Sequence, residues 1–214
     1  MANGTVVIDA GHGGTGSLGG SDGNHAVSVS GVKEKDLTLI LANLLRDELQ
    51  NAAAAGGHNL NIIMTRTTDV NLSLRDRAHV ARDNQADRFI SIHLNASDAH
   101  NARGVETYIH SSTLNPTAGK RFATRIQNAV FNTINGFDPN TRDRGVKEAK
   151  FGVLNDQSLG NANGGHCRAV LQEVEFLDVP AVDVLLNTGP NAGAVRTAIA
   201  SALANAIIDD LANP

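Results

Sequence analysis

Apolar residues along this chain fall into two patterns, short β-branched runs and longer stretches with helical spacing. The short runs predict strands, because each is bounded by polar or glycine-rich residues. They lie at residues 5–9, 61–65, 88–92, 104–109 and 168–174, with a further extended segment at 150–154. The helical spacing predicts helices at 34–50, from Ser73 onward, at 114–134 and at 192–211.

The helix predicted at 34–50 has the clearest amphipathic pattern. Its apolar residues recur at three- and four-residue spacing, which places them on one face of a helix. They are Leu37, Ile40, Leu41, Leu44, Leu45 and Leu49. The pair Gly56-Gly57 is expected to end this segment. Ser73, followed three residues later by Asp76, approximates a capping box and is expected to begin the next helix.

Strands that alternate with helices are typical of an α/β fold with a twisted, mostly parallel sheet and helices on both faces. A chain of 214 residues, 41% of them hydrophobic, has the right size for one such core. No internal repeat divides the sequence, so residues 1–214 are predicted to form a single domain. The first four residues, 1–4, are interpreted as an added start that precedes it.

Composition and charge argue against several classes of function. The formal net charge is −4 and the isoelectric point is about 6.0, so no basic surface suggests a nucleic-acid partner. No apolar run approaches the roughly 20 residues that cross a bilayer, so membrane insertion is not expected. The start of the chain lacks the basic and apolar regions of a signal peptide, and none is expected in this chain. Aromatic residues make up 3%, which argues against a separate glycan-binding module within it.

Candidate chemistry is concentrated at the ends of predicted strands. His12 comes just after the first strand, and His93 comes at the end of the strand at 88–92. The carboxyl ends of strands in an open α/β sheet meet at one edge, where ligands bind. With Glu34 at the start of a helix, two imidazoles and a carboxylate leave a fourth position open, as in catalytic zinc sites. Glu173, on the last strand, is predicted to be the base of a zinc hydrolase.

Other residues are weaker candidates. Asp9 or a nearby backbone carbonyl is expected to orient a ligand imidazole. Among the remaining histidines only His166, in the loop before the last strand, is kept as a substrate contact; the others are His25, His58, His79, His100 and His110. The glycine-rich loop after the first strand lacks the lysine and hydroxyl of a phosphate-binding loop. The single thiol, Cys167, is interpreted as a packed side chain rather than a nucleophile.

Four segments together strongly resemble the zinc-dependent N-acetylmuramoyl-L-alanine amidases of the amidase-3 type. They are Asp9-Ala10-Gly11-His12-Gly13-Gly14, Glu34-Lys35-Asp36-Leu37-Thr38-Leu39, Ser91-Ile92-His93-Leu94-Asn95 and Leu171-Gln172-Glu173-Val174-Glu175-Phe176. The resemblance extends over residues 6–211. It implies a phosphorylase/hydrolase-like sheet flanked by helices, zinc ligands His12, Glu34 and His93, and a catalytic Glu173.

The resemblance also implies a substrate and a setting. Enzymes of this type hydrolyse the amide between N-acetylmuramic acid and L-alanine in peptidoglycan, and one Zn²⁺ per chain is expected. The chain is then expected to act outside the cytoplasm (in the periplasm, in the cell wall or secreted), as a monomeric domain of an exported protein. A wall-remodelling autolysin and a phage lysin both fit. Two alternatives stay open: a zinc peptidase or acylase with another amide substrate, and a non-catalytic wall-binding domain.

Two departures from the family pattern lie near the last strand. Family members usually carry glycine at the position of Glu175 and a shorter segment at 155–165, and both differences are expected to reshape the rim of the cleft. If the strand continues through Phe176, Glu175 should share a side with Glu173 and tune it or contact the peptide. If the strand ends at Val174, Glu175 should turn to solvent. Segment 111–165 has no obvious extra acidic helix, so the site is expected to be open without an activator.

Overall fold

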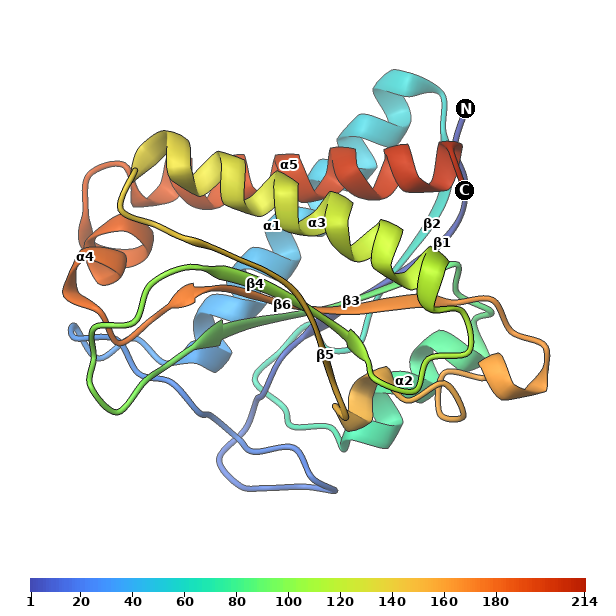
Figure 1. The fold of residues 1–214 in the computed structure, drawn as a ribbon, viewed down its shortest axis with the longest axis horizontal. Helices are drawn as coiled ribbons and strands as arrows, with labels where there is room; N and C mark the ends of the chain where they lie inside the picture. The colour runs from blue at the N-terminus through green and yellow to red at the C-terminus, as the bar shows by residue number, and fades with distance from the viewer.

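A twisted six-stranded sheet runs through the centre of the molecule, in the order β2-β1-β3-β6-β4-β5 (Figure 1). The computed structural model describes residues 1–214. The strands are β1 (Asn3–Ala10), β2 (Asn59–Met64), β3 (Arg88–Asn95), β4 (Val105–His110), β5 (Asp143–Ala149) and β6 (Arg168–Phe176). All neighbouring strands are parallel except β4 and β6, which are antiparallel. The predicted α/β fold with a mostly parallel sheet is therefore confirmed.

Helices cover the two faces of the sheet unequally. The long helices α1 (Glu34–Gly56), α3 (Pro116–Phe137) and α5 (Ala192–Ala212) lie on one face, above the sheet in Figure 1. On the other face α2 (Leu74–Asp83) packs with a short 3₁₀ turn at Gly152–Leu154. A short α4 (Pro180–Asp183) follows β6. None of these helices is long and apolar enough to cross a membrane.

The predicted helix ends are confirmed where a local signal is strong. Ser73 caps α2, because its hydroxyl accepts a hydrogen bond from the Asp76 N–H at 3.0 Å. Gly57 ends α1 in the left-handed region at φ +62°, a conformation that glycine adopts without a steric penalty. The start of α2 is therefore fixed by the Ser73 side chain, and the end of α1 by the backbone freedom of Gly57.

The extended segment predicted at 150–154 is wrong. The strand in this region is β5 (Asp143–Ala149), and Gly152–Leu154 forms a 3₁₀ turn. β5 is an edge strand and carries charged residues, so it lacks the apolar signal of an inner strand. Val153 and Leu154 are apolar because they are buried in the smaller core beneath the sheet.

Residues 2–4 pack with the rest of the domain. Asn3 begins β1, and Ala2 is completely buried. The Ala2 N–H donates a hydrogen bond to His58 Nδ1 at 3.0 Å. The backbone from Ala2 onward is thus held by the fold.

A buried carboxylate joins the last helix to the sheet. Asp210 on α5 is completely buried and accepts hydrogen bonds from Arg88 Nε on β3 at 2.6 Å and Arg168 Nη1 on β6 at 3.0 Å. Arg125 Nε on α3 lies 3.3 Å from its other oxygen. Burial of so many cations is tolerable only while this carboxylate is present.

We expect Asp210→Asn to lower the free energy of unfolding by about 3–5 kcal/mol, because Arg88 would remain buried without its counter-charge. Denaturant unfolding would measure the loss. The matched control is Asp209→Asn, whose side chain is 57% exposed and pairs with Arg125; its loss should stay below about 1 kcal/mol. Equal losses for the two variants would contradict a structural role for Asp210.

Candidate metal centre

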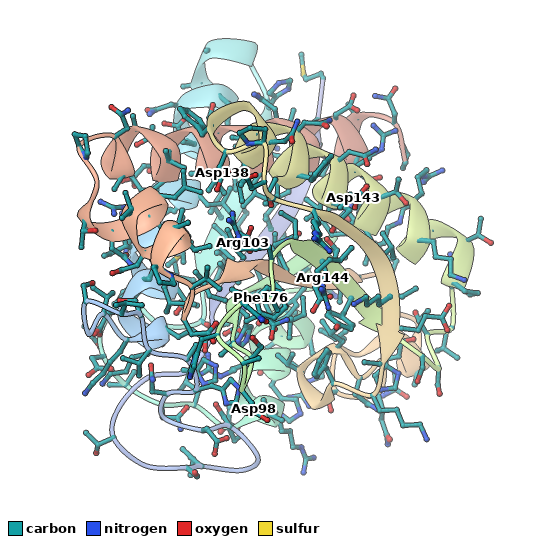
Figure 2. The ribbon with its side chains drawn as sticks, turned by 60° about the vertical axis from the view of Figure 1, so that its left-hand side comes forward. Asp98, Arg103, Asp138, Asp143, Arg144 and Phe176 are labelled. Carbon is teal, nitrogen blue, oxygen red and sulfur yellow. The ribbon has the colours of Figure 1, made fainter.

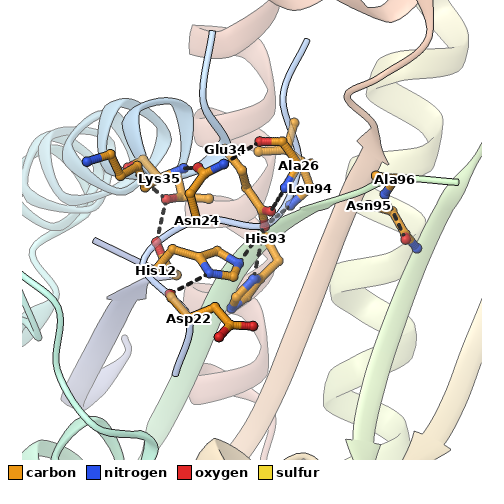
Figure 3. A network of polar contacts seen from close by, with 12 residues as sticks. His12, Asp22, Asn24, Ala26, Glu34, Lys35, His93, Leu94, Asn95 and Ala96 are labelled. Carbon is orange, nitrogen blue, oxygen red and sulfur yellow. Dashed lines mark hydrogen bonds and ion pairs between the residues drawn. The ribbon is translucent and has the colours of Figure 1, made fainter. Parts of the chain in front are cut away.

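Three predicted ligands, from three different elements, meet at the carboxyl edge of the sheet (Figure 3). His12 lies just after β1, Glu34 begins α1, and His93 lies near the end of β3. Glu34 Oε1 is 3.1 Å from both His12 Nε2 and His93 Nδ1. The three ligand atoms all lie within 4.8 Å of one another. The sequence prediction that these three side chains meet is therefore correct in geometry.

The surroundings of His12 fix its orientation. Its Nδ1 is 2.9 Å from the Asp22 carbonyl oxygen, which can only accept, so Nδ1 carries the proton and donates. Its backbone has φ +60°, and Arg77 Nη2 donates to its carbonyl oxygen at 2.7 Å. Gly11 is required beside it, because a Cβ at that position would lie 2.4 Å from the His93 ring. The imidazole therefore presents Nε2 to Glu34.

Asp9 does not orient a ligand imidazole, although it was one of the two predicted candidates. It is fully buried and accepts hydrogen bonds from Thr65, Arg77 and Ser91 at 2.6, 2.8 and 2.7 Å. Burial opposes its ionisation, but the Arg77 charge and these hydrogen bonds lower the pKa of Asp9. The orienting group is the other candidate, a backbone carbonyl, and it belongs to Asp22.

Glu34 is held as a buried carboxylate. Only 1% of it is exposed, its Oε2 accepts from the Ala26 N–H at 2.9 Å, and its Oε1 accepts from the Leu94 N–H at 3.0 Å. Burial alone would raise its pKa, but the neighbouring His12 and His93 lower the pKa of Glu34 well below its usual range. The anion is therefore fixed in position before any ligand arrives.

The donor set fits a zinc ion. In a tetrahedral site with bonds of about 2.0–2.1 Å, neighbouring ligand atoms are roughly 3.3 Å apart; Glu34 Oε1 lies 3.1 Å from each histidine nitrogen, and all three ligand atoms lie within 4.8 Å of one another. His12 also faces acceptors at both ring nitrogens, the Asp22 carbonyl and the Glu34 carboxylate. A neutral imidazole has one N–H and cannot satisfy both. Either a second proton on the ring or a cation between His12 Nε2 and Glu34 removes the conflict, so the geometry is compatible with a metal ion.

Glu173 lies beside this cluster, as predicted. It pairs in register with His93 on β3 and with Glu106 on β4. Its Oε2 is buried and has no hydrogen-bond partner. Burial, followed by the charges of Glu34 and Glu106, raises the pKa of Glu173 well above its usual value. Such a carboxyl group is suited to exchanging a proton.

A cavity of about 300 Å³ opens over these side chains. Its lining includes His12, Glu34, His93 and Glu173, with Phe151 and Asn95 on its walls. From segment 111–165 only Phe151, Gly152 and Val153 line it. A small molecular group can therefore reach the ligand atoms and Glu173 together.

His166 and Cys167 lie away from this cavity. Both directly precede β6, at the opposite edge of the sheet, and both line other cavities. His166 pairs with Asp87 at 2.8 Å, so the predicted substrate contact is wrong. Burial raises the pKa of the Cys167 thiol to about 12, which agrees with a packed thiol and not a nucleophile. Loop 155–165 lines the same distant cavities and does not form the cleft rim.

Glu175 meets neither of the two predicted outcomes. β6 does continue through Phe176, but its pairing with β3 shifts between Glu173 and Phe176, where β6 has an extra residue. Such a bulge breaks the alternation of side chains, so Glu173 and Glu175 need not share a side. Glu175 is completely buried, and neither the cleft nor solvent reaches it.

The buried Glu175 instead ties together two loops, the one before β4 and the one between α3 and β5. It accepts hydrogen bonds from Arg103 Nε at 3.0 Å, the Gly104 N–H at 2.8 Å and the Thr141 hydroxyl at 2.9 Å. Arg103 also donates to Asp138 at 2.8 Å, and both residues are labelled in Figure 2. The side chain of Glu175 is therefore structural.

We expect Glu175→Gln to lower the free energy of unfolding by about 3 kcal/mol, because Arg103 loses a buried counter-charge. Substrate preference should not change, since the side chain does not reach the cavity. Urea unfolding and a comparison of relative rates on different peptide substrates would check this. A changed substrate preference with an unchanged free energy of unfolding would contradict the structural role and indicate that Glu175 contacts the substrate.

Comparisons with known proteins agree with this geometry. A family model described as N-acetylmuramoyl-L-alanine amidase (Amidase_3) matches residues 6–206. The solved catalytic domain of CwlV, an N-acetylmuramoyl-L-alanine amidase from Bacillus (Paenibacillus) polymyxa var. colistinus, superimposes with a TM-score of 0.75 at 28% identity. That alignment covers 96% of each chain.

Two curated relatives from Bacillus subtilis (strain 168) are similar over 150 residues, 70% of this chain. The uncharacterized protein YqiI is 39% identical, and the N-acetylmuramoyl-L-alanine amidase LytC is 35% identical. The matched segments are 63% and 26% of these relatives. The relatives are therefore longer proteins of which the chain matches one part.

Proposed function

Because this chain belongs to the N-acetylmuramoyl-L-alanine amidase family Amidase_3, we propose that it hydrolyses the amide between N-acetylmuramic acid and L-alanine in peptidoglycan. The observation that carries the proposal is the convergence of two imidazoles and one carboxylate on a cavity that also contains Glu173. That set of groups matches the needs of metal-assisted amide hydrolysis.

His12 Nε2, Glu34 Oε1 and His93 Nδ1 would hold one zinc ion. A bound zinc ion lowers the pKa of a coordinated water from 15.7 toward about 7 and polarises a carbonyl group. The Asp22 carbonyl keeps His12 in the tautomer that ligation requires. The backbone N–H groups of Ala26 and Leu94 hold Glu34 ionised and in place.

Glu173 would supply the proton transfers. Its unpartnered Oε2 can accept a proton from the water that attacks the amide carbonyl. The same carboxyl group would then donate that proton to the nitrogen of the leaving L-alanine. Its partly buried position beside Glu34 favours the protonated form, which makes the second transfer easier.

The substrate sets the place of action. Peptidoglycan lies outside the cytoplasm, so the chain would act in the periplasm, in the wall or as a secreted protein, as part of an exported protein. We further propose that it acts as a monomer. We also propose that it needs no activator, because Phe151, Gly152 and Val153 are the only residues of segment 111–165 that line the cavity. Wall remodelling by an autolysin and lysis by a phage enzyme use the same reaction.

Two other functions would differ from this one in their products or in the groups that they need. A zinc peptidase or acylase would use the same ligands, and only its products distinguish it. A non-catalytic wall-binding domain has no need for a buried carboxyl group with a free oxygen, and Glu173 has one. The unpartnered Glu173 therefore favours catalysis over binding alone.

We expect the purified protein to clear a suspension of cell walls and to contain about one zinc per chain. Dialysis against a chelator should stop clearing, and added Zn²⁺ should restore it, because two imidazoles and a carboxylate do not activate water without a cation. Turbidity and metal analysis on the same sample would measure both. Full activity in a sample verified to be free of metal would rule out this mechanism.

A further inference from the structure

Two cations on the edge strand β5 are brought to one face of the sheet by a bulge. Arg144 and Lys147 are three positions apart, so a regular strand would point them to opposite faces. The pairing of β5 with β4 shifts between Val105 and Thr107, where β5 has an extra residue, and Gly145 has φ +76°. Both cations consequently reach Glu106. Bulges that re-aim a side chain are common next to active sites.

Glu106 holds both cations in place but leaves the two outer nitrogens of Arg144 free to bind a ligand. Only 2% of it is exposed; it accepts from Arg144 Nε at 2.7 Å and also pairs with Lys147 Nζ. Arg144 lies over the Phe176 ring, 5.0 Å from its centroid, and Figure 2 shows the two side by side. No hydrogen bond or ion pair engages Arg144 Nη1 or Nη2. One carboxylate therefore holds two cations, and the side chains of both are about one-third exposed.

This cation pair adjoins the cavity of the metal centre. Asn95, on the cavity wall, donates to Glu106 at 2.6 Å. A second chain of contacts also links the cation pair to the cavity. Lys147 lies over the ring of Tyr108, and this ring packs edge-on, 5.0 Å between centroids, against Phe151, which lines the cavity. β4 alone separates β5 from the strand of Glu173. With about 4.8 Å between strands, the backbone of β5 lies roughly 10 Å from that of Glu173 across the sheet, the length of about three extended residues.

We propose that Arg144 and Lys147 bind a carboxylate of the peptide that leaves the scissile amide, about three residues from that bond. The inference rests on the proposed function and names the kind of substrate that the site prefers. The lactyl carboxyl of muramic acid is consumed in the amide, so a free carboxylate near the cations must belong to the peptide. The two outer nitrogens of an arginine fork match a carboxylate in geometry, and Lys147 adds a second charge.

The test compares two N-acetylmuramoyl tripeptides with uncharged side chains, one ending in a carboxylate and the other in a carboxamide. We expect kcat/KM on the acid to exceed that on the amide by about 10- to 100-fold, the worth of a charge-assisted hydrogen bond. The difference should lie in KM, with kcat within about twofold, because the contact is made equally in the ground and transition states.

Variants assign the preference to these side chains. R144Q and K147Q should each reduce the ratio of acid to amide, and R144K should keep part of it, because the charge remains while the fork is lost. R142Q removes an exposed cation two residues away and should leave the ratio unchanged. The ratio is insensitive to partial unfolding, since fewer folded molecules lower both rates equally.

If the wild type cleaves peptidoglycan but acts on the acid and the amide at equal rates, whether high or zero, the carboxylate proposal is wrong. A preference that survives in R144Q and K147Q alike would overturn it too. If the wild type fails to cleave peptidoglycan under conditions in which it holds its metal, the proposed function itself is wrong.

Discussion

Glu173→Gln is expected to retain the fold and the metal while activity falls by at least about 100- to 10,000-fold. The amide side chain has nearly the shape of the carboxyl group but can neither accept the proton of the attacking water nor return it to the leaving nitrogen. The strand position that holds Glu173, in register with His93 and Glu106, does not depend on the charge. Wall clearing and metal content, measured on one preparation, would test both halves of this prediction.

The matched control is Glu148→Gln. Glu148 lies on β5, its side chain is 44% exposed and it pairs with Lys120, away from the cavity. Its loss should leave activity and metal content unchanged. If Glu173→Gln instead lost its zinc, Glu173 would be a ligand and the roles of Glu173 and Glu34 would have to be exchanged.

His93→Ala is expected to abolish tight zinc binding. The remaining His12 and Glu34 would leave the ion mostly hydrated, and we expect the affinity to fall by more than about 100-fold. Metal analysis after dialysis should change from about one zinc per chain to nearly none, and wall clearing should stop with it.

His100→Ala serves as the control for histidine loss. The His100 side chain is 71% exposed and pairs with Asp178, outside the ligand cluster. This variant should keep its zinc. Stoichiometric zinc in His93→Ala with full activity would show that the three side chains meet for another reason.

The sequence predicted that His12, Glu34 and His93 would meet, because the place of each follows from a rule about position in the fold. Strands that end in histidine place the ring at the carboxyl edge of a parallel sheet, and a glutamate at a helix start points to the same edge. Inner strands and capped helices were predicted for similar reasons, since burial and capping leave local signals. The strongest inferences were therefore those in which local pattern and topology agreed.

The errors have a common physical cause, because each depends on a contact that is not local in sequence. The bulge after Glu173 follows from how β6 pairs with β3, and it turned Glu175 into a buried partner of Arg103. The edge strand β5 escaped detection because an edge strand needs little apolar surface. The sequence did not show which of the two candidates orients His12, because the backbone carbonyl of Asp22 carries no residue-type signal.

Mass spectrometry of the fragments released from purified peptidoglycan tests the central claim most directly. The account predicts peptides whose new amino terminus is L-alanine, together with glycan strands whose lactyl carboxyl groups are free. The same digest with Glu173→Gln should release neither product. New termini within the peptide would identify a peptidase and contradict the account, as would new reducing ends in the glycan with the lactyl amide intact.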